Sequence, residues 1–126
     1  MSGGLMGTTG SIVEYALDGL SQRHMAIAAN IANIDSAGYR PIRVSFESHI
    51  AAYLNRTTGR TSTETSLQLP SPQISSEPPV TNALRRASME NEIVQLNRNV
   101  LQYQALIGGL GKYASIIYTA INEGRR

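Results

Sequence analysis

The 126-residue sequence contains no cysteine and few charged side chains. Without cysteine, the chain cannot form a disulfide, bind zinc or an iron–sulfur cluster through thiolates, or use a thiol nucleophile. Only 16% of the residues are charged, and the formal net charge is +2 at pH 7. A positive excess this small does not favour a nucleic-acid-binding function.

Long apolar runs are also missing. The longest run, at residues 25–29, is far shorter than the roughly 20 apolar residues that a transmembrane helix needs. Residues 1–10 carry no positive charge and no apolar run of about 7–15 residues, which a cleaved secretory signal would contain. We therefore expect neither membrane insertion nor a cleaved signal peptide.

The first periodic segment lies near the N-terminus. Apolar residues recur there at alternating steps of four and three, which places them on one face of a helix. Ser11 is followed three residues later by Glu14, the spacing of a capping box that satisfies two free backbone N–H groups. The pattern predicts a helix over residues 11–34 that begins at Ser11. Its apolar face comprises Val13, Leu17, Leu20, Ile27, Ile31 and Ile34.

A longer periodic segment lies near the C-terminus. The same alternation continues without a break over residues 89–121, which is coiled-coil spacing. It predicts one helix over residues 88–122, with Ser88 as its N-cap and with Glu90 and Glu92 in its first turn. Three glycines at 108–111 each cost about 1 kcal/mol in a helix interior, so this helix needs packing to hold it. Its apolar face comprises Met89, Ile93, Leu96, Val100, Tyr103, Ile107, Leu110, Ala114, Ile117 and Ile121.

Residues 35–56 allow two local structures. Ile42, Val44 and Phe46 alternate with polar residues, which is typical of a short strand. Phe46, Ile50 and Tyr53 also follow a helical spacing. The sequence predicts a turn followed by either a short strand or a short helix.

The segment over residues 57–87 is rich in serine, threonine and proline. Between residues 57 and 79, ten of 23 residues are Ser or Thr and four are Pro. Such a composition buries too little apolar surface to offset the entropy lost on ordering. We expect this segment to be a flexible or extended loop.

These elements predict an all-α fold in a single unit spanning residues 1–126. The two long helices should pack as an antiparallel, coiled-coil-like pair, with an extended or partly disordered middle segment. At 1.5 Å per residue they would measure about 35 and 50 Å, so neither can fully cover the other. The chain therefore reads as a component of a larger assembly. The packing residues expected in the pair or the assembly are Val13, Leu17, Leu20, Ile27, Ile93, Leu96, Val100, Tyr103, Ile107, Leu110, Ile117 and Ile121.

The end of the first helix carries a motif. From its residues alone, the segment 29–46 is a helix end followed by a turn, in which Gly38 accepts a positive φ at little cost. Its sequence, ANIANIDSAGYRPIRVSF, resembles the signature of bacterial flagellar axial proteins. Ser36 and Ala37 stand where that family usually has Thr and Pro. The matching residues are Asn30, Ile31, Ala32, Asn33, Gly38, Tyr39 and Phe46.

The C-terminal segment resembles one particular group within these axial proteins. Residues 89–122 resemble the last helix of the FlgB family of proximal rod proteins, which has an acidic start, an Asn, a Tyr-Gln pair and a long apolar tail. The residues that carry the match are Glu92, Asn99, Tyr103, Gln104, Ala120 and Ile121.

The resemblance implies a structural protein and not an enzyme. It implies export through the flagellar type III apparatus without a cleaved signal, followed by helical assembly in the rod of the basal body, on the periplasmic side of the inner membrane. The implied partners are further copies of the chain, other rod proteins of the FlgC, FlgF and FlgG types, a FliE-type adaptor, the membrane-ring protein and the export gate. No catalytic, cofactor-binding or metal-binding residues are expected, and neither nucleic acid nor direct membrane insertion is implied.

A different class of function also fits the C-terminal periodicity. A soluble helical adaptor or chaperone could dimerise through the same heptads. The two hypotheses differ in solution, because an adaptor forms a discrete dimer whereas a rod subunit forms open assemblies or stays partly unfolded.

Overall fold

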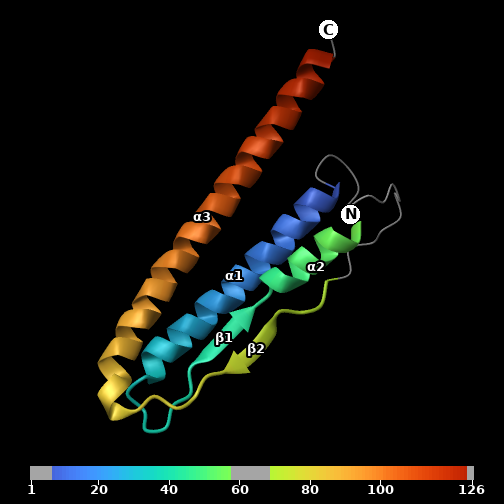
Figure 1. The fold of residues 1–126 in the computed structure, drawn as a ribbon. Helices are drawn as coiled ribbons and strands as arrows, with labels where there is room; N and C mark the ends of the chain where they lie inside the picture. The colour runs from blue at the N-terminus through green and yellow to red at the C-terminus, as the bar shows by residue number, and fades with distance from the viewer. Residues whose placement is uncertain (1–6, 58–68, 125–126) are drawn as a thin grey trace.

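The computed structural model describes residues 7–57 and 69–124, apart from the side chains at positions 8, 57, 113, 117, 121, 123 and 124. Two long helices dominate it: α1 (Gly7–Asn33) and α3 (Arg85–Gly124) lie side by side (Figure 1). Between them come β1 (Ile42–Ser45), α2 (Glu47–Thr57), β2 (Gln73–Ser76) and a short 3-10 helix, η1 (Asn82–Leu84). The prediction of a mostly helical chain with long helices near both ends is confirmed.

The all-α prediction is wrong in one respect, because β1 and β2 form a two-stranded antiparallel sheet. Its register pairs Ile42 with Ser76 and Val44 with Ile74. Both alternatives for the middle segment are realised in succession, since the strand β1 leads directly into the helix α2. The segment expected to be flexible or extended contains β2, and its residues 58–68 lie outside the described part of the chain.

Both predicted helix starts are corrected by about one turn. α1 begins at Gly7, and the Ser11 hydroxyl donates a hydrogen bond to the Gly7 carbonyl within the helix, 3.2 Å away. The capping box at Ser11 is therefore wrong. α3 begins at Arg85 because η1 feeds into it directly, so Ser88 is not its N-cap and its first turn contains no acidic residue. The capping patterns predicted both starts too late, because each helix begins several residues before the first residue of its apolar stripe.

The core lies where α1, β1 and the start of α2 meet. Its buried cluster comprises Ala16, Leu20, Ala26, Val44 and Phe46. Leu106 of α3 packs against this cluster and is itself partly buried. Two of the α1 residues in this cluster, Ala16 and Ala26, are small, so neighbouring elements can pack close to α1.

α3 is much longer than α1, with 40 residues against 27. At 1.5 Å per residue the two helices measure about 60 and 40 Å. The C-terminal end of α3 consequently projects past α1 (Figure 1). Within the described residues, no helix is long and apolar enough to cross a membrane.

Candidate functional site

The motif after α1 forms a tight turn that returns the chain beside the helix end. Gly38 has φ +73°, a left-handed conformation that glycine adopts without the strain a side chain causes. The turn is closed by backbone bonds from Ser36 N to the Asn33 carbonyl (2.9 Å) and from Tyr39 N to the Ser36 carbonyl (3.2 Å). The prediction of a positive φ at Gly38 is confirmed.

Asn30 fixes the returning chain against α1. Its amide donates to the Ile42 carbonyl (3.0 Å) and its Oδ1 accepts from the Ile42 N–H (2.9 Å), so the side chain pairs with β1 as a neighbouring peptide group would. The Tyr39 hydroxyl donates to the same Oδ1 at 2.8 Å. Asn30 is fully buried, and these bonds meet the requirement of buried polar atoms for partners.

The other motif residues have lesser roles in the described structure. Asn33 is exposed and donates from its side chain to the Ala29 carbonyl one turn earlier, at 2.8 Å. Ile31 is half-buried and Ala32 is exposed. Asn30, Tyr39 and Phe46 are thus the motif side chains that join separate segments of the chain.

Glu92 of α3 connects this motif to the second long helix. Asn30 donates its amide to Glu92 Oε1 at 2.9 Å, and Arg43 of β1 donates to both carboxylate oxygens at 3.1 and 2.6 Å. Arg43 also pairs with Glu77, which follows β2, at 3.1 Å. We call the five side chains of Asn30, Tyr39, Arg43, Glu77 and Glu92 the polar cluster. It ties α1, the turn, both strands and α3 together at one end of the molecule.

The surroundings of Arg43 and Tyr39 in the polar cluster shift the pKa values of both side chains. Burial opposes the charge on Arg43, but the hydrogen bonds that it donates to Glu92 and Glu77 outweigh this effect and raise the pKa of Arg43. Burial, together with the nearby charge of Glu92 and against that of Arg43, raises the pKa of the Tyr39 hydroxyl. Both groups therefore stay protonated at neutral pH and keep their hydrogen atoms for donation.

A second group of contacts anchors Phe46, the last motif residue. Arg23 of α1 donates to the Val44 carbonyl from Nε (3.0 Å) and Nη2 (2.7 Å), and to both carboxylate oxygens of Glu47 at 2.7 and 2.8 Å. Its guanidinium carbon lies 4.7 Å from the centre of the Phe46 ring. Tyr15 meets the same ring edge-on, with the centroids 6.2 Å apart. Arg23 therefore joins α1 to both β1 and α2.

The Arg23–Glu47 pair makes stability depend on acid pH. The hydrogen bonds from Arg23, which outweigh burial, lower the pKa of Glu47 from 4.5 to about 2. Since the folded pKa is lower than the unfolded one, the contribution is complete above about pH 4.5 and is lost as the pH falls toward 2. We expect the unfolding free energy of the wild type to fall over this window more than that of Glu47→Gln, by a modest amount because the carboxylate is half exposed. Urea titrations of both proteins from pH 6 to 2 would measure it, and parallel curves would contradict it.

The predicted packing residues are more deeply buried on α1 than on α3. Leu20 and Ile27 are buried, and Val13 and Leu17 are half-buried. On α3, Met89, Leu96 and Leu110 are half-buried, but the remaining described members of the stripe are exposed in the single chain. Their exposed fractions are 46% for Ile93, 38% for Val100, 38% for Tyr103 and 47% for Ile107. The predicted side chains at Ile117 and Ile121 lie outside the described residues.

The apolar stripe of α3 faces α1 only in part: Met89, Leu96 and Leu110 are half-buried, and Val100 and Tyr103 line a groove that α3 forms with α1. Among the α3 side chains that the structure describes, the buried ones are Glu92 and Asn99, which lie one position before Ile93 and Val100. Adjacent positions differ by about 100° around a helix. The bonds from Asn30 to Glu92 and from Asn99 to the Leu20 carbonyl (2.9 Å) set this rotation. They leave the stripe turned partly to solvent.

A groove of about 340 Å³ lies between α1 and α3. Asn99 reaches into it, and although its amide is bonded to the Leu20 carbonyl, its Oδ1 is buried without a hydrogen-bond partner among the described residues. An unsatisfied buried acceptor costs about 1–3 kcal/mol. The groove is lined by Leu20, Ser21, His24, Met25, Asn99, Val100, Tyr103 and Gln104.

The polar cluster is satisfied within the chain and contains no paired nucleophile and base. Over residues 7–57 and 69–124, no three His, Asp or Glu side chains gather in a way that could hold a metal ion. No protein-family model matches the chain, and no curated protein matches it.

Proposed function

We propose that the protein is a structural subunit of the proximal rod of the bacterial flagellar basal body, of the FlgB type. It is exported through the flagellar type III apparatus and assembles helically into a shaft that transmits torque. The observation that carries this proposal is that the two segments that resemble the family make different kinds of contact. Asn30, Tyr39 and Phe46 of the axial motif make contacts inside the chain, whereas Ile93, Val100, Tyr103 and Ile107 of the apolar stripe of α3 stay 38–47% exposed.

The uncovered surface supports an assembling protein. Besides the stripe, α3 exposes Val94, Leu101, Ile116 and Tyr118, with exposed fractions of 52–68%. Exposure of this many large apolar side chains along one helix favours an interaction surface. Between residues 99 and 122, Lys112 is the single charged residue, so a neighbouring subunit can cover the helix with little desolvation of charge. Each subunit would contribute its two long helices as an antiparallel, coiled-coil-like pair.

The geometry of such contacts decides the kind of assembly. A surface that meets a different surface on the next copy produces a ring when the rotation between copies closes and an open helical array when it does not, unlike the closed dimer of a self-complementary surface. In the proposed rod the chain contacts further copies of itself and rod proteins of the FlgC, FlgF and FlgG types. The FliE-type adaptor, the membrane ring and the export gate lie below it, on the periplasmic side of the inner membrane.

The adaptor hypothesis uses the same stripe differently. Two copies pairing through residues 93–110 of α3 would bury the stripe in a closed dimer. Sedimentation equilibrium distinguishes the two functions. A single dimeric species over a wide concentration range would favour the adaptor, whereas association that continues beyond the dimer would favour the rod subunit.

The substitution Ile107→Asp tests the proposed function. Ile107 is 47% exposed in the single chain, so a charge there should change the stability of the chain by only about 0.5 kcal/mol. In an assembled rod the same carboxylate would be buried without a partner, at a cost of several kcal/mol. We expect a bacterium that carries only this variant to lose swimming, and its salt-washed basal bodies to lack the chain by mass spectrometry.

Gln102→Asp is the matched control, because residue 102 is exposed on the same helix but lies off the stripe. It carries the same helix-propensity cost and should leave swimming intact. Normal swimming by the Ile107→Asp strain, or absence of the wild-type chain from basal bodies, would count against the rod function.

A further inference from the structure

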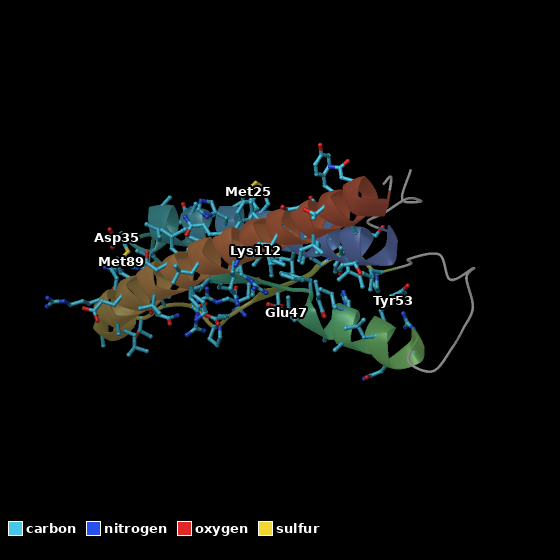
Figure 2. The ribbon with its side chains drawn as sticks, turned by 90° about the horizontal axis from the view of Figure 1, so that it is seen from above. Met25, Asp35, Glu47, Tyr53, Met89 and Lys112 are labelled. Carbon is cyan, nitrogen blue, oxygen red and sulfur yellow. The ribbon has the colours of Figure 1, made fainter. Side chains whose placement is uncertain are left out.

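The groove between α1 and α3 has the chemistry of a site for a neutral, largely apolar group that carries one hydrogen-bond donor. Leu20, Met25 and Val100 give it apolar walls, and no Asp, Glu, Lys or Arg lines it. Met25 is 64% exposed, and its sulfur lies at the outer edge of the two long helices (Figure 2). Asn99 is 2% exposed, and its Oδ1 is buried and lacks a hydrogen-bond partner among the described residues.

Tyr118 has the complementary chemistry. It lies on the projecting part of α3 and is 68% exposed, with an apolar ring that ends in a donor. Gly111 and Ala114 precede it by seven and four residues and therefore share its face of the helix. A Cβ built on Gly111 would meet nothing within 4 Å. The tyrosine therefore stands beside small residues, which let another helix approach closely.

We infer that the groove of one copy receives Tyr118 of a second copy, and that the lining side chains shift on binding so that the Tyr118 hydroxyl donates a hydrogen bond to Asn99 Oδ1. The inference rests on the proposed function, since it names the contact through which the subunits associate. The occupant must come from another molecule, because residues 103 and 118 of one continuous helix are about 22 Å apart. Ile116 and Leu101 are equally exposed on α3 but have no donor for Asn99.

This contact joins two different surfaces, a groove near the middle of α1 and a tyrosine near the end of α3. Every copy then offers one free groove and one free tyrosine, so association continues from copy to copy. The bond also gives Asn99 the partner that it lacks in the single chain, which favours the assembled state over the free one.

The absence of cysteine makes thiol crosslinking a direct test. The variant Gln104→Cys/Ala114→Cys places one thiol at the rim of the groove and one on the face of Tyr118. The two positions are about 15 Å apart along α3, so a short bis-maleimide joins them only between copies. We expect a ladder of dimers, trimers and larger products. Gln104→Cys/Ile116→Cys, with its second thiol on another face of the helix, should give little, and adding Tyr118→Ala to the first pair should abolish the ladder.

A ladder no stronger than that of the Ile116 control, or products that stop at the dimer, would overturn the inference. The same pair can be crosslinked in isolated basal bodies. If the chain is retained there without this crosslink, the inference fails while the rod function stands. If the chain is absent from basal bodies, the rod function fails, and the purified protein still decides whether the groove binds Tyr118.

A double-mutant cycle tests the hydrogen bond itself. Tyr118→Phe removes only the hydroxyl and should weaken self-association about fivefold, the effect of losing one neutral hydrogen bond. Asn99→Leu removes the acceptor and should weaken association; it also removes the amide bond to the Leu20 carbonyl, so the thermal midpoint of each variant is measured to confirm that it is folded. In the Asn99→Leu background, Tyr118→Phe should have no further effect. Additive losses of association in the double variant would overturn the proposed bond.

Discussion

Replacing Arg43 with methionine is expected to lower the unfolding free energy by about 3–5 kcal/mol. Glu92 is only 1% exposed, and its carboxylate is held by Arg43 and the amide of Asn30. Without the guanidinium, a buried negative charge keeps a single neutral donor, and this is far more costly than losing a surface ion pair. Urea denaturation at pH 7, followed by circular dichroism, would measure the loss.

The double variant Arg43→Met/Glu92→Met provides the control. Replacing both members of a buried ion pair with apolar residues of similar size is often neutral, so most of the lost stability should return. Asn30 would still donate to the Ile42 carbonyl, and Glu77 is exposed enough to be solvated by water. A double variant as unstable as Arg43→Met would show that the side chain of Arg43 acts through packing and not through its charge.

Gly19→Ala is expected to destabilise the chain by about 1–3 kcal/mol, the usual cost of forcing an extra methyl into a packed core. A Cβ at residue 19 would lie 2.6 and 2.7 Å from Cε1 and Cγ of the Phe46 ring. The ring is 3% exposed and is confined by Arg23 and Tyr15, so it has little room to move. The thermal midpoint, measured with the unfolding enthalpy, would give the loss.

Gly108→Ala is the matched comparison, since a Cβ there would meet nothing within 4 Å. In α3 this change should stabilise the isolated chain by up to about 1 kcal/mol through helix propensity. The same substitution thus has opposite signs at the two sites. Equal stabilisation by both would mean that Phe46 does not pack against residue 19.

The sequence predicted the two long helices because their apolar residues recur over many turns. It did not predict which side of α3 faces α1. The rows through Glu92 and Ile93 run beside each other on one helix, and the choice between them is made by Asn30 and the Leu20 carbonyl, which come from distant parts of the chain. Periodicity favoured the apolar row, whereas hydrogen bonding buried the polar one.

The sequence also predicted only some of the residues of the candidate site. The motif residues stood out by resemblance, and Gly38 by its turn composition. Arg23, Arg43 and Gly19 were missed, because each acts through a partner brought near by folding. A glycine in the middle of a helical pattern was the one local signal for the Phe46 contact. Similarly, β1 was one of two local alternatives, and its partner β2 lies some 30 residues later in a polar segment.

Because the polar cluster lies at one end of the two long helices, we expect the molecule to be stiffer at that end than at the projecting end of α3. Glu92 and Asn99 fasten the first half of α3 to α1, and Leu106 is the last described residue of α3 that packs against the core. Leu110 is still half-buried, and the part of α3 that follows projects past α1; glycines 108, 109 and 111, which restrain the backbone less than other residues, lie where this projecting part begins. A bending force on the free end is therefore absorbed at residues 108–111, while the fastened half keeps its shape. Neighbouring helices that brace this end would convert the flexible arm into a rigid element.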